Sequence, residues 1–225
     1  MKYLEKLKPT LDKASEKYVN ATVIRVGISS IPYIGGSLDI LFSAKGNELI
    51  QERIQSFLEY LDKEMQKIKE DKIDKDYIQS ESWFDLVYIS FDEVRKTRLK
   101  EKHKLFAKIL ANSTVIYKSK TNVEQYQKLV SYFSVVDFIV LTELYNKINI
   151  VMGSDYKAII EFWGNLKIDN LSKEELDISI SRLFSQGLLR ERYGAILDYD
   201  GGHYLITPLM INFMKFMAED EEDLK

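Results

Sequence analysis

The side chains best suited to catalysis are few in this chain and stand apart from one another. There is no cysteine, which excludes disulfides, thiolate metal sites and cysteine nucleophiles. The two histidines, His103 and His203, have no partner at catalytic or metal-ligand spacing. Asp198 and Asp200 precede a glycine pair, but the twelve-residue calcium-loop pattern is missing. The sequence therefore predicts a protein that is not an enzyme and that has no metal and no cofactor.

The stretch VGISSIPYIGGSLDILFSA, residues 26–44, is the least polar part of the chain. It lacks the GK[ST] and G-x-G-x-x-G patterns, so a phosphate loop is excluded. A membrane-spanning helix needs roughly 20 unbroken apolar residues, and proline and glycine divide this run into shorter halves. We interpret it as a buried helical hairpin; the alternative is a segment that inserts into a membrane on a trigger. Its characteristic residues are Ile31, Pro32, Tyr33, Gly35 and Gly36.

The strongest electrostatic feature is the run RKTRLKEKHKLFAK, residues 95–108, in which Glu101 is the only acid. Four of its lysines recur every four residues, which on one helix would form a slowly drifting stripe. Such a stripe suits phosphates or anionic lipid headgroups. The alternative is an ordinary solvated face whose lysine stems cover apolar surface. The candidate anion-binding residues are Arg95, Lys96, Arg98, Lys100, Lys102, Lys104 and Lys108.

Charge is distributed unevenly along the 225 residues. Residues 1–120 hold 22 Lys and Arg against 18 Asp and Glu, whereas residues 121–225 hold 10 against 17. An anionic partner should therefore prefer the first half. The N-terminus has mixed charges and no apolar leader, and together with the lack of cysteine this predicts a cytoplasmic protein, with membrane association as an open alternative.

The spacing of apolar residues predicts a mainly α-helical fold with two domains. The first, residues 1–120, contains the 26–44 hairpin, a long amphipathic helix over 47–69 and a basic helix over 95–110. Ser82 is the expected N-cap of a helix that begins before the basic run. A polar segment around 117–122 marks the expected boundary with the second domain, residues 121–225.

The second domain has the order of a winged helix-turn-helix. Ser134 can cap one helix, and a second is expected around 154–165. A third begins with a capping box of Ser172 and Glu175 and ends at Gly187. A β-hairpin with a glycine-rich tip follows, and Thr207-Pro208 opens the last helix.

Winged helices often bind DNA through the third helix, but the charges here oppose it. The start of that helix holds one lysine among three acids, and the wing tip carries two aspartates. A winged helix used for protein contacts is therefore preferred over one that binds DNA. The residues that would make the contact in either case are Lys173, Arg182, Arg190 and Arg192.

Two blocks of the sequence resemble a known bacterial layout. The first is KHKLFAKILANSTVIYKSKTNVEQYQKLVSYFSVVDFIVLTELYNKI, with Tyr132, Phe133, Ser134 and Asp137 at a helix start; the second is ISRLFSQGLL followed by GGHYLITPLMINFMKFM. The pattern is similar to the abortive-infection alpha family, which is associated with bacterial defence against phage. It covers residues 102–217 and departs at Met210, where such endings often have glycine. The resemblance implies growth arrest or membrane damage on infection and supplies no catalytic residues.

These observations lead to one functional hypothesis and one alternative. The hypothesis is a non-enzymatic bacterial protein that acts through protein or membrane contacts in phage defence, with the winged helix as the docking module. Its partners are a protein and, secondarily, an anionic membrane. The alternative is a transcription regulator that binds DNA as a homodimer formed through the 47–69 helix, with an affinity that falls steeply with salt.

Overall fold

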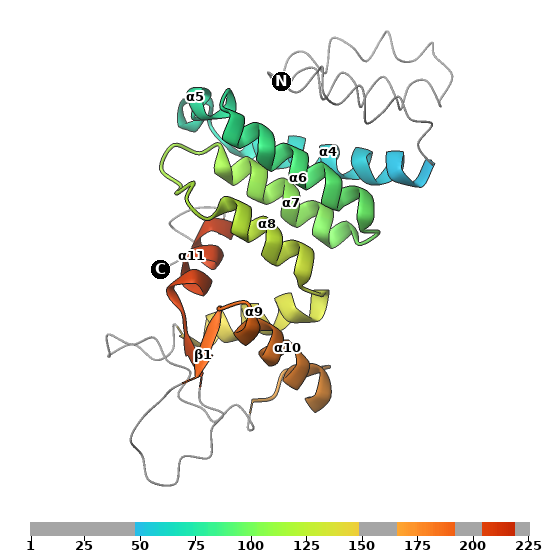
Figure 1. Ribbon diagram of the computed structural model, residues 1–225, viewed down its shortest axis with the longest axis vertical. Helices are drawn as coiled ribbons and strands as arrows, with labels where there is room; N and C mark the ends of the chain where they lie inside the picture. The colour runs from blue at the N-terminus through green and yellow to red at the C-terminus, as the bar shows by residue number, and fades with distance from the viewer. Residues whose placement is uncertain (1–47, 149–165, 192–203, 219–225) are drawn as a thin grey trace. The chain divides into compact units, whose positions relative to one another are not determined.

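The computed structural model describes residues 48–148, 166–191 and 204–218, which are mainly helical with one small antiparallel sheet (Figure 1). The chain divides into two compact units after Ser131. The elements of the first are α4 (Glu48–Lys67), the 3-10 turn η1 (Glu70–Lys72), α5 (Lys75–Ile78), α6 (Glu81–Lys96), α7 (Lys100–Ser113) and most of α8 (Val123–Tyr132). Those of the second are α9 (Val135–Ile148), α10 (Lys173–Ser185), β1 (Leu189–Glu191), β2 (Tyr204–Ile206) and α11 (Pro208–Met217).

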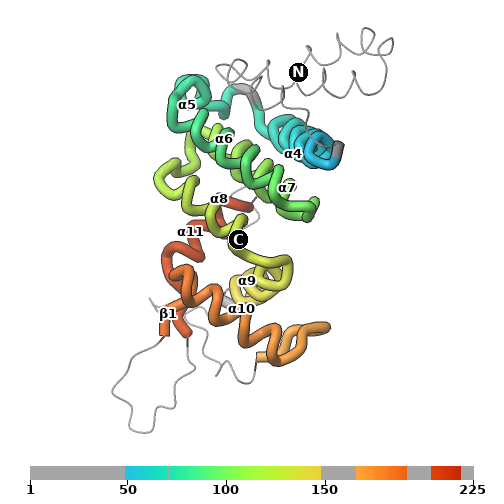
Figure 2. The backbone as a smooth tube through the Cα atoms, turned by 45° about the vertical axis from the view of Figure 1, so that its right-hand side comes forward, coloured from blue at the N-terminus to red at the C-terminus, as the bar shows by residue number. Residues whose placement is uncertain are grey.

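Helix α4 confirms the amphipathic helix expected over 47–69. Its buried residues Ile54, Phe57 and Leu61 recur at intervals of three or four, which places them on one face of the helix. That face packs on α6 and α7, and the three helices lie side by side (Figure 2). The ring of Phe57 meets the ring of Phe91 edge to face, with 5.3 Å between centroids. The apolar stripe of α4 is therefore used inside this unit.

Helix α6 begins two residues earlier than the sequence predicted. Ser80, and not Ser82, is the N-cap: its backbone is extended and its hydroxyl accepts from the backbone N of Trp83 at 3.2 Å. Ser82 already lies within the first helical turn. The prediction of Ser82 was wrong because both serines precede the same apolar stripe, and only the backbone conformation distinguishes a cap from a first-turn residue.

The basic helix expected over 95–110 is in fact two helices. Helix α6 ends at Lys96 and α7 begins at Lys100, with extended backbone at Thr97 and Leu99 between them. The hydroxyl of Thr97 accepts from the backbone N of Leu99 at 3.3 Å. The carbonyl of Thr97 accepts from Nε2 of His103 at 2.9 Å. These bonds satisfy backbone groups at the break, and the first of them shows how a threonine side chain can compete with a helix.

Helix α8 is held to α6 by a buried amide. Nε2 of Gln127 donates to the carbonyl of Leu86 at 2.8 Å and to the hydroxyl of Ser90 at 2.7 Å. Both Gln127 and Ser90 are fully buried, and a buried hydrogen bond of this kind is costly to lose. The docking of α8 explains why the compact units divide after Ser131, whereas the sequence placed the boundary near residue 120.

In the second unit, α9 and α10 are joined through the buried carboxylate of Asp137. Ser134 caps α9 as expected: its hydroxyl accepts from the backbone N of Asp137 at 3.3 Å, and Oδ2 of Asp137 accepts from the backbone N of Ser134 at 2.7 Å. From α10, Ser179 donates to Oδ1 at 2.5 Å and Nη1 of Arg182 lies 3.2 Å from Oδ2. The carboxylate therefore has hydrogen bonds on both oxygens although it has no exposed surface.

The start and end of α10 confirm the sequence prediction. Ser172 and Glu175 form the capping box. At the C-terminus the backbone N of Gly187 donates to the carbonyl of Phe184 at 3.0 Å, and that of Leu188 donates to the carbonyl of Leu183 at 3.0 Å. This pair of bonds is the Schellman motif, and it requires the positive φ of 73° that Gly187 adopts.

The small sheet and the last helix follow directly from that turn. Strands β1 and β2 pair antiparallel, with Leu189 opposite Ile206. Thr207 is the N-cap of α11, as expected, and its hydroxyl also donates to the carbonyl of Gly187 at 2.7 Å. The helix expected at 154–165 and the tip of the hairpin, residues 192–203, lie outside the described residues.

The Asp137 network yields a stability prediction. Asp137→Ala should lower the free energy of unfolding by about 3 kcal/mol, because it removes a buried charge and leaves Ser179 and Arg182 without their acceptor. Urea denaturation followed by circular dichroism measures this. The control is Glu143→Ala, which removes a carboxylate from the same helix that makes no hydrogen bond within the described chain. Equal midpoints for the two variants would contradict the prediction.

The turn after α10 yields a second prediction. Gly187→Ala should cost roughly 1 kcal/mol of unfolding free energy, because alanine is strained at positive φ. No atom lies within 4 Å of an added Cβ, so the cost comes from the backbone alone. Asparagine tolerates this conformation, and Gly187→Asn should therefore be less destabilised than Gly187→Ala in the same urea titration. The reverse order would show that the turn is not strained.

Candidate functional site

The cations predicted to form one stripe over 95–108 have different surroundings in the structure. Lys96 is paired at the end of α6: its Nζ lies 2.6 Å from Oδ2 of Asp92 and 3.0 Å from Oε1 of Glu93. Lys96 donates to both carboxylates, and these hydrogen bonds, the one to Asp92 most and then the one to Glu93, raise the pKa of Lys96. Arg95 lies 3.9 Å from Asp92. The charges of Arg95 and Lys96 are thus largely balanced by their own helix.

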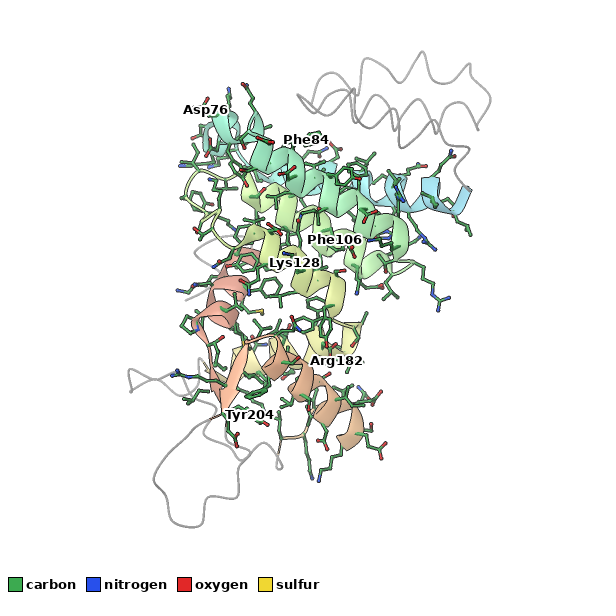
Figure 3. All side chains as sticks on the ribbon, viewed as in Figure 1. Asp76, Phe84, Phe106, Lys128, Arg182 and Tyr204 are labelled. Atoms are coloured by element: carbon green, nitrogen blue, oxygen red, sulfur yellow. The ribbon has the colours of Figure 1, made fainter. Side chains whose placement is uncertain are left out.

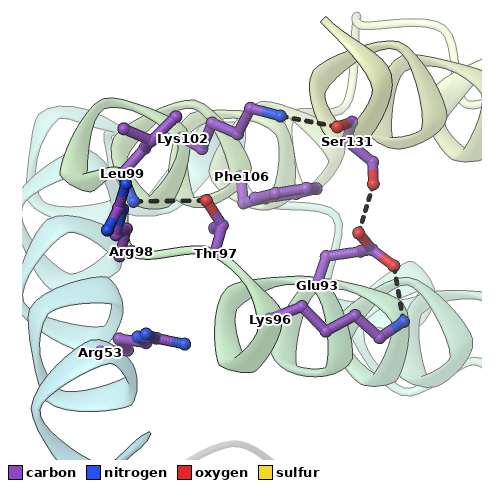
Figure 4. A pocket seen from close by; sticks show the side chains of 9 residues that line it. All are labelled: Arg53, Glu93, Lys96, Thr97, Arg98, Leu99, Lys102, Phe106 and Ser131. Carbon is purple, nitrogen blue, oxygen red and sulfur yellow. Dashed lines mark hydrogen bonds and ion pairs between the residues drawn. The ribbon is translucent and has the colours of Figure 1, made fainter. Parts of the chain in front are cut away.

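A hollow of about 470 Å³ opens beside the break between α6 and α7 (Figure 4). It lies within the first unit and draws side chains from α4, α6, α7 and the end of α8. Four of its lining residues are cations and one is an acid. The lining residues are Arg53, Glu93, Lys96, Thr97, Arg98, Leu99, Lys102, Phe106 and Ser131.

Arg53 is the functional candidate that the sequence analysis missed. Its Nη1 donates to the carbonyl of Arg95 at 2.6 Å, which holds the guanidinium at the C-terminal end of α6. Arg53 is 42 residues away from that carbonyl in sequence. Nothing in the local spacing around Arg53 distinguishes it from other polar residues of α4. Only the packing of α4 on α6 and α7 reveals it.

The opposite wall of the hollow is an organised polar network. Nζ of Lys102 donates to the carbonyl of Ser131 at 2.6 Å. The hydroxyl of Ser131 donates to Glu93 in a short hydrogen bond, and Glu93 also accepts from Lys96 (Figure 4). The single acid of the hollow is therefore occupied by two donors. Phe106, labelled in Figure 3, is fully buried beneath them.

The remaining residues of the stripe do not line this hollow. Lys100 lines a second hollow of about 450 Å³, which shares Arg53 and Arg98 with the first. Lys104 and Lys108 line neither. The stripe was predicted as one row of lysines on one helix; that geometry was wrong, because Lys96 belongs to α6 and the others to α7.

His103 lies against the second hollow and is buried, with 1% of its surface exposed. Its Nε2 donates to the carbonyl of Thr97, so in the neutral ring Nδ1 is an acceptor. Within the described residues, Nδ1 has no hydrogen-bond partner. Burial, which disfavours the charged ring, is the main cause of a lowered pKa of His103, and Arg53 and Lys100 lower it further.

The four residues predicted for the winged-helix contact differ in their exposure and in their partners. Lys173 is exposed at the start of α10, and Arg190 is exposed on β1. Arg182 is held by Asp137 and lies 3.5 Å from the hydroxyl of Ser134. Arg192 lies outside the described residues. A third hollow, of about 380 Å³, opens on α10 and is lined by Tyr132, Asp177, Ile178, Ser181, Arg182 and Ser185.

The apolar hairpin residues Ile31, Pro32, Tyr33, Gly35 and Gly36 all lie outside the described residues. In the part of the chain that is described, no helix is long and apolar enough to cross a membrane. No cluster of three or more metal-ligating side chains occurs among residues 48–148, 166–191 and 204–218.

Comparison with known proteins gives no relative for this chain. No family model, no curated protein and no solved structure matches it.

The burial of His103 predicts a pH dependence of stability. The unfolded chain takes up a proton at this histidine near pH 6.5, whereas the folded chain resists it, so the unfolded state binds more protons below that pH. The contribution is present above pH 6.5 and is lost as pH falls through the lowered folded pKa. The free energy of unfolding, measured by urea titration from about pH 7.5 to about pH 5, should therefore fall, with a slope of at most about 1.4 kcal/mol per pH unit from this group.

The control for this prediction is the other histidine. His103→Gln keeps an amide donor for the carbonyl of Thr97 and does not titrate, so its stability should change less over this pH range. His203→Gln should retain the slope assigned to His103. A slope that is unchanged in His103→Gln would contradict the assignment.

Proposed function

We propose that this is a non-enzymatic bacterial protein that acts by macromolecular contact in phage defence, and that its C-terminal unit is a winged helix that docks a protein partner. The order α9, α10, β1, β2, α11 supports the winged helix, because α10 leads through Gly187 into the first strand and Thr207 links the second strand to the last helix. The setting in phage defence rests on the motifs within residues 102–217.

The outward face of α10 is the observation that carries the docking proposal. Ile178 is 52% exposed and Phe184 42% exposed, which is high for side chains of this size. Tyr132, 54% exposed, lines the hollow on α10 together with Ile178. Exposed apolar side chains gathered around a hollow are typical of interaction surfaces. We call the surface around this hollow, formed by Tyr132, Asp177, Ile178 and Ser181, the α10 face.

The charges around the α10 face define the partner. Lys173 is the one cation at the start of α10, against Glu174, Glu175 and Asp177. Oδ1 of Asp177 is buried and has no hydrogen-bond partner within the described residues. A desolvated carboxylate oxygen is costly unless a donor meets it, and a cationic donor meets it best. The partner we propose is therefore a protein segment that presents basic and apolar side chains together.

The same residues oppose the alternative of a DNA-binding regulator. Phosphate contacts need cations that are available, and Arg182 already serves the buried carboxylate of Asp137. The acids at the start of α10 would face the phosphates. A dimer through α4 is disfavoured as well, because its apolar residues Ile54, Phe57 and Leu61 are buried against α6 and α7.

A phage-protection assay with paired variants tests the proposal. The full chain is expressed in a phage-sensitive bacterial host, and the efficiency of plaquing is measured for a phage panel. Ile178→Asp should abolish protection, because it places a charge at the centre of the α10 face. The matched variant Lys173→Glu with Arg190→Glu should retain it, because these cations lie outside the α10 face.

Binding of the purified chain to a labelled random DNA duplex distinguishes the two mechanisms. A regulator using Lys173, Arg190 and Arg192 would lose affinity about 40-fold between about 50 and about 200 mM salt, from three phosphate contacts. Such binding, if Lys173→Glu with Arg190→Glu removed it, would overturn the protein-contact mechanism. Lack of protection against every phage tested would overturn the defence setting.

A further inference from the structure

Two hollows of the first unit meet at the same pair of arginines. The first, of about 470 Å³, and the second, of about 450 Å³, share Arg53 from α4 and Arg98 from the break between α6 and α7. Figure 4 shows both arginines in the first hollow. Hollows of this size match those that hold small molecules in proteins. The cation-lined first hollow and the mixed second hollow could therefore receive two parts of one ligand.

The two arginines have unused hydrogen-bonding capacity. A guanidinium carries five N–H donors in a fixed fork. Arg53 uses Nη1 on the carbonyl of Arg95, and within the described residues no carboxylate pairs with Arg53 or with Arg98. In the same hollow Lys96 and Glu93 neutralise each other at 3.0 Å. A planar fork of this kind is the preferred protein group for binding phosphate oxygens in pairs.

The start of α7 adds donors at the same place. Leu99 stands at the N-cap position and makes no side-chain cap hydrogen bond. The first amides of α7 are thus left without the acceptor that a serine or aspartate would supply, and the helix dipole favours an anion there. Leu99 itself lines the first hollow.

The second hollow is lined by acceptors as well as cations. Glu52, Glu59 and His103 all line it. Nδ1 of His103 is buried, lacks a partner within the described residues and can accept a hydrogen bond. Carboxylates and a neutral imidazole nitrogen are acceptors for hydroxyl groups, so this hollow suits a polyhydroxyl group beside the phosphate.

We propose that the two hollows together bind a sugar phosphate group, with the phosphate between Arg53, Arg98 and the start of α7 and the hydroxyls toward Glu52, Glu59 and His103. The group belongs either to a free molecule or to a phospholipid headgroup that carries hydroxyls. This site lies within the first unit and does not depend on docking by the α10 face.

Calorimetry on the full chain at low salt tests the site. The probes are ribose 5-phosphate, inorganic phosphate and ribose, and vesicles containing phosphatidylglycerol stand for the lipid source. Ribose 5-phosphate should bind most tightly, inorganic phosphate more weakly and ribose not measurably. Arg98→Gln should weaken ribose 5-phosphate by about tenfold or more, the usual effect of removing one charged hydrogen-bonding group.

Lys104→Gln is the matched control, because it removes one positive charge from α7 and lines neither hollow. It should bind ribose 5-phosphate within about twofold of the unaltered chain, since an exposed charge outside a site acts weakly. Arg98 is exposed and has no hydrogen bond within the described residues, so Arg98→Gln should fold normally.

Each outcome of these measurements either supports or overturns the proposed site. Binding of ribose 5-phosphate that Arg98→Gln weakens and Lys104→Gln does not supports the site with a free ligand. Binding only to the vesicles, with the same dependence on Arg98, supports it with a lipid headgroup. Equal losses in the two variants would show a general charge effect and overturn the site, as would the lack of binding to every probe.

Discussion

The carboxylate of Asp137 has no exposed surface, so the residues around it must supply its hydrogen bonds. Burial alone would raise its pKa, but donors from Ser179, Ser134 and Arg182 together hold the pKa below its usual value. Two of these donors belong to α10, which fixes how α10 lies on α9. The faces of α10 are determined as a result: Ser179 points inward, and Ile178 is left outside. The interaction that stabilises this unit therefore also defines its exposed surface.

A cation that already pairs with a carboxylate of its own chain is less able to bind a ligand. The cations of the first unit differ in this respect. Lys96 is balanced by Asp92 and Glu93, as Arg182 is balanced by Asp137 in the second unit. Arg98 differs because it lies in the break between α6 and α7, and no carboxylate pairs with it within the described residues. Two hydrogen bonds to Thr97 stabilise that break. Because the helix is interrupted between Lys96 and Lys100, Arg98 lines a hollow together with Arg53 instead of lying on a continuous basic helix.

Features encoded by neighbouring residues could be predicted from the sequence. The capping boxes at Ser134 and Ser172, the turn at Gly187 and the start of α11 at Thr207 each depend on residues within four positions. The break at Thr97 was missed because Arg, Lys and Thr are compatible with a continuing helix, and only the contact with His103 favours the extended form. Arg53 was missed because its position depends on packing between helices distant in sequence. The cation stripe was accordingly predicted with the wrong geometry, because its residues belong to two helices and the break between them.

The first hollow is positively charged and the start of α10 is negatively charged, so one charged partner is not attracted to both. The first hollow retains the charges of Arg53 and Arg98 once Lys96 and Glu93 cancel, whereas the start of α10 has three carboxylates for one lysine. A polyanion such as DNA would be attracted to the first and repelled by the second. A basic protein segment would have the opposite preference. The two proposed sites therefore share no side chain, and a substitution in one leaves the lining residues of the other unchanged.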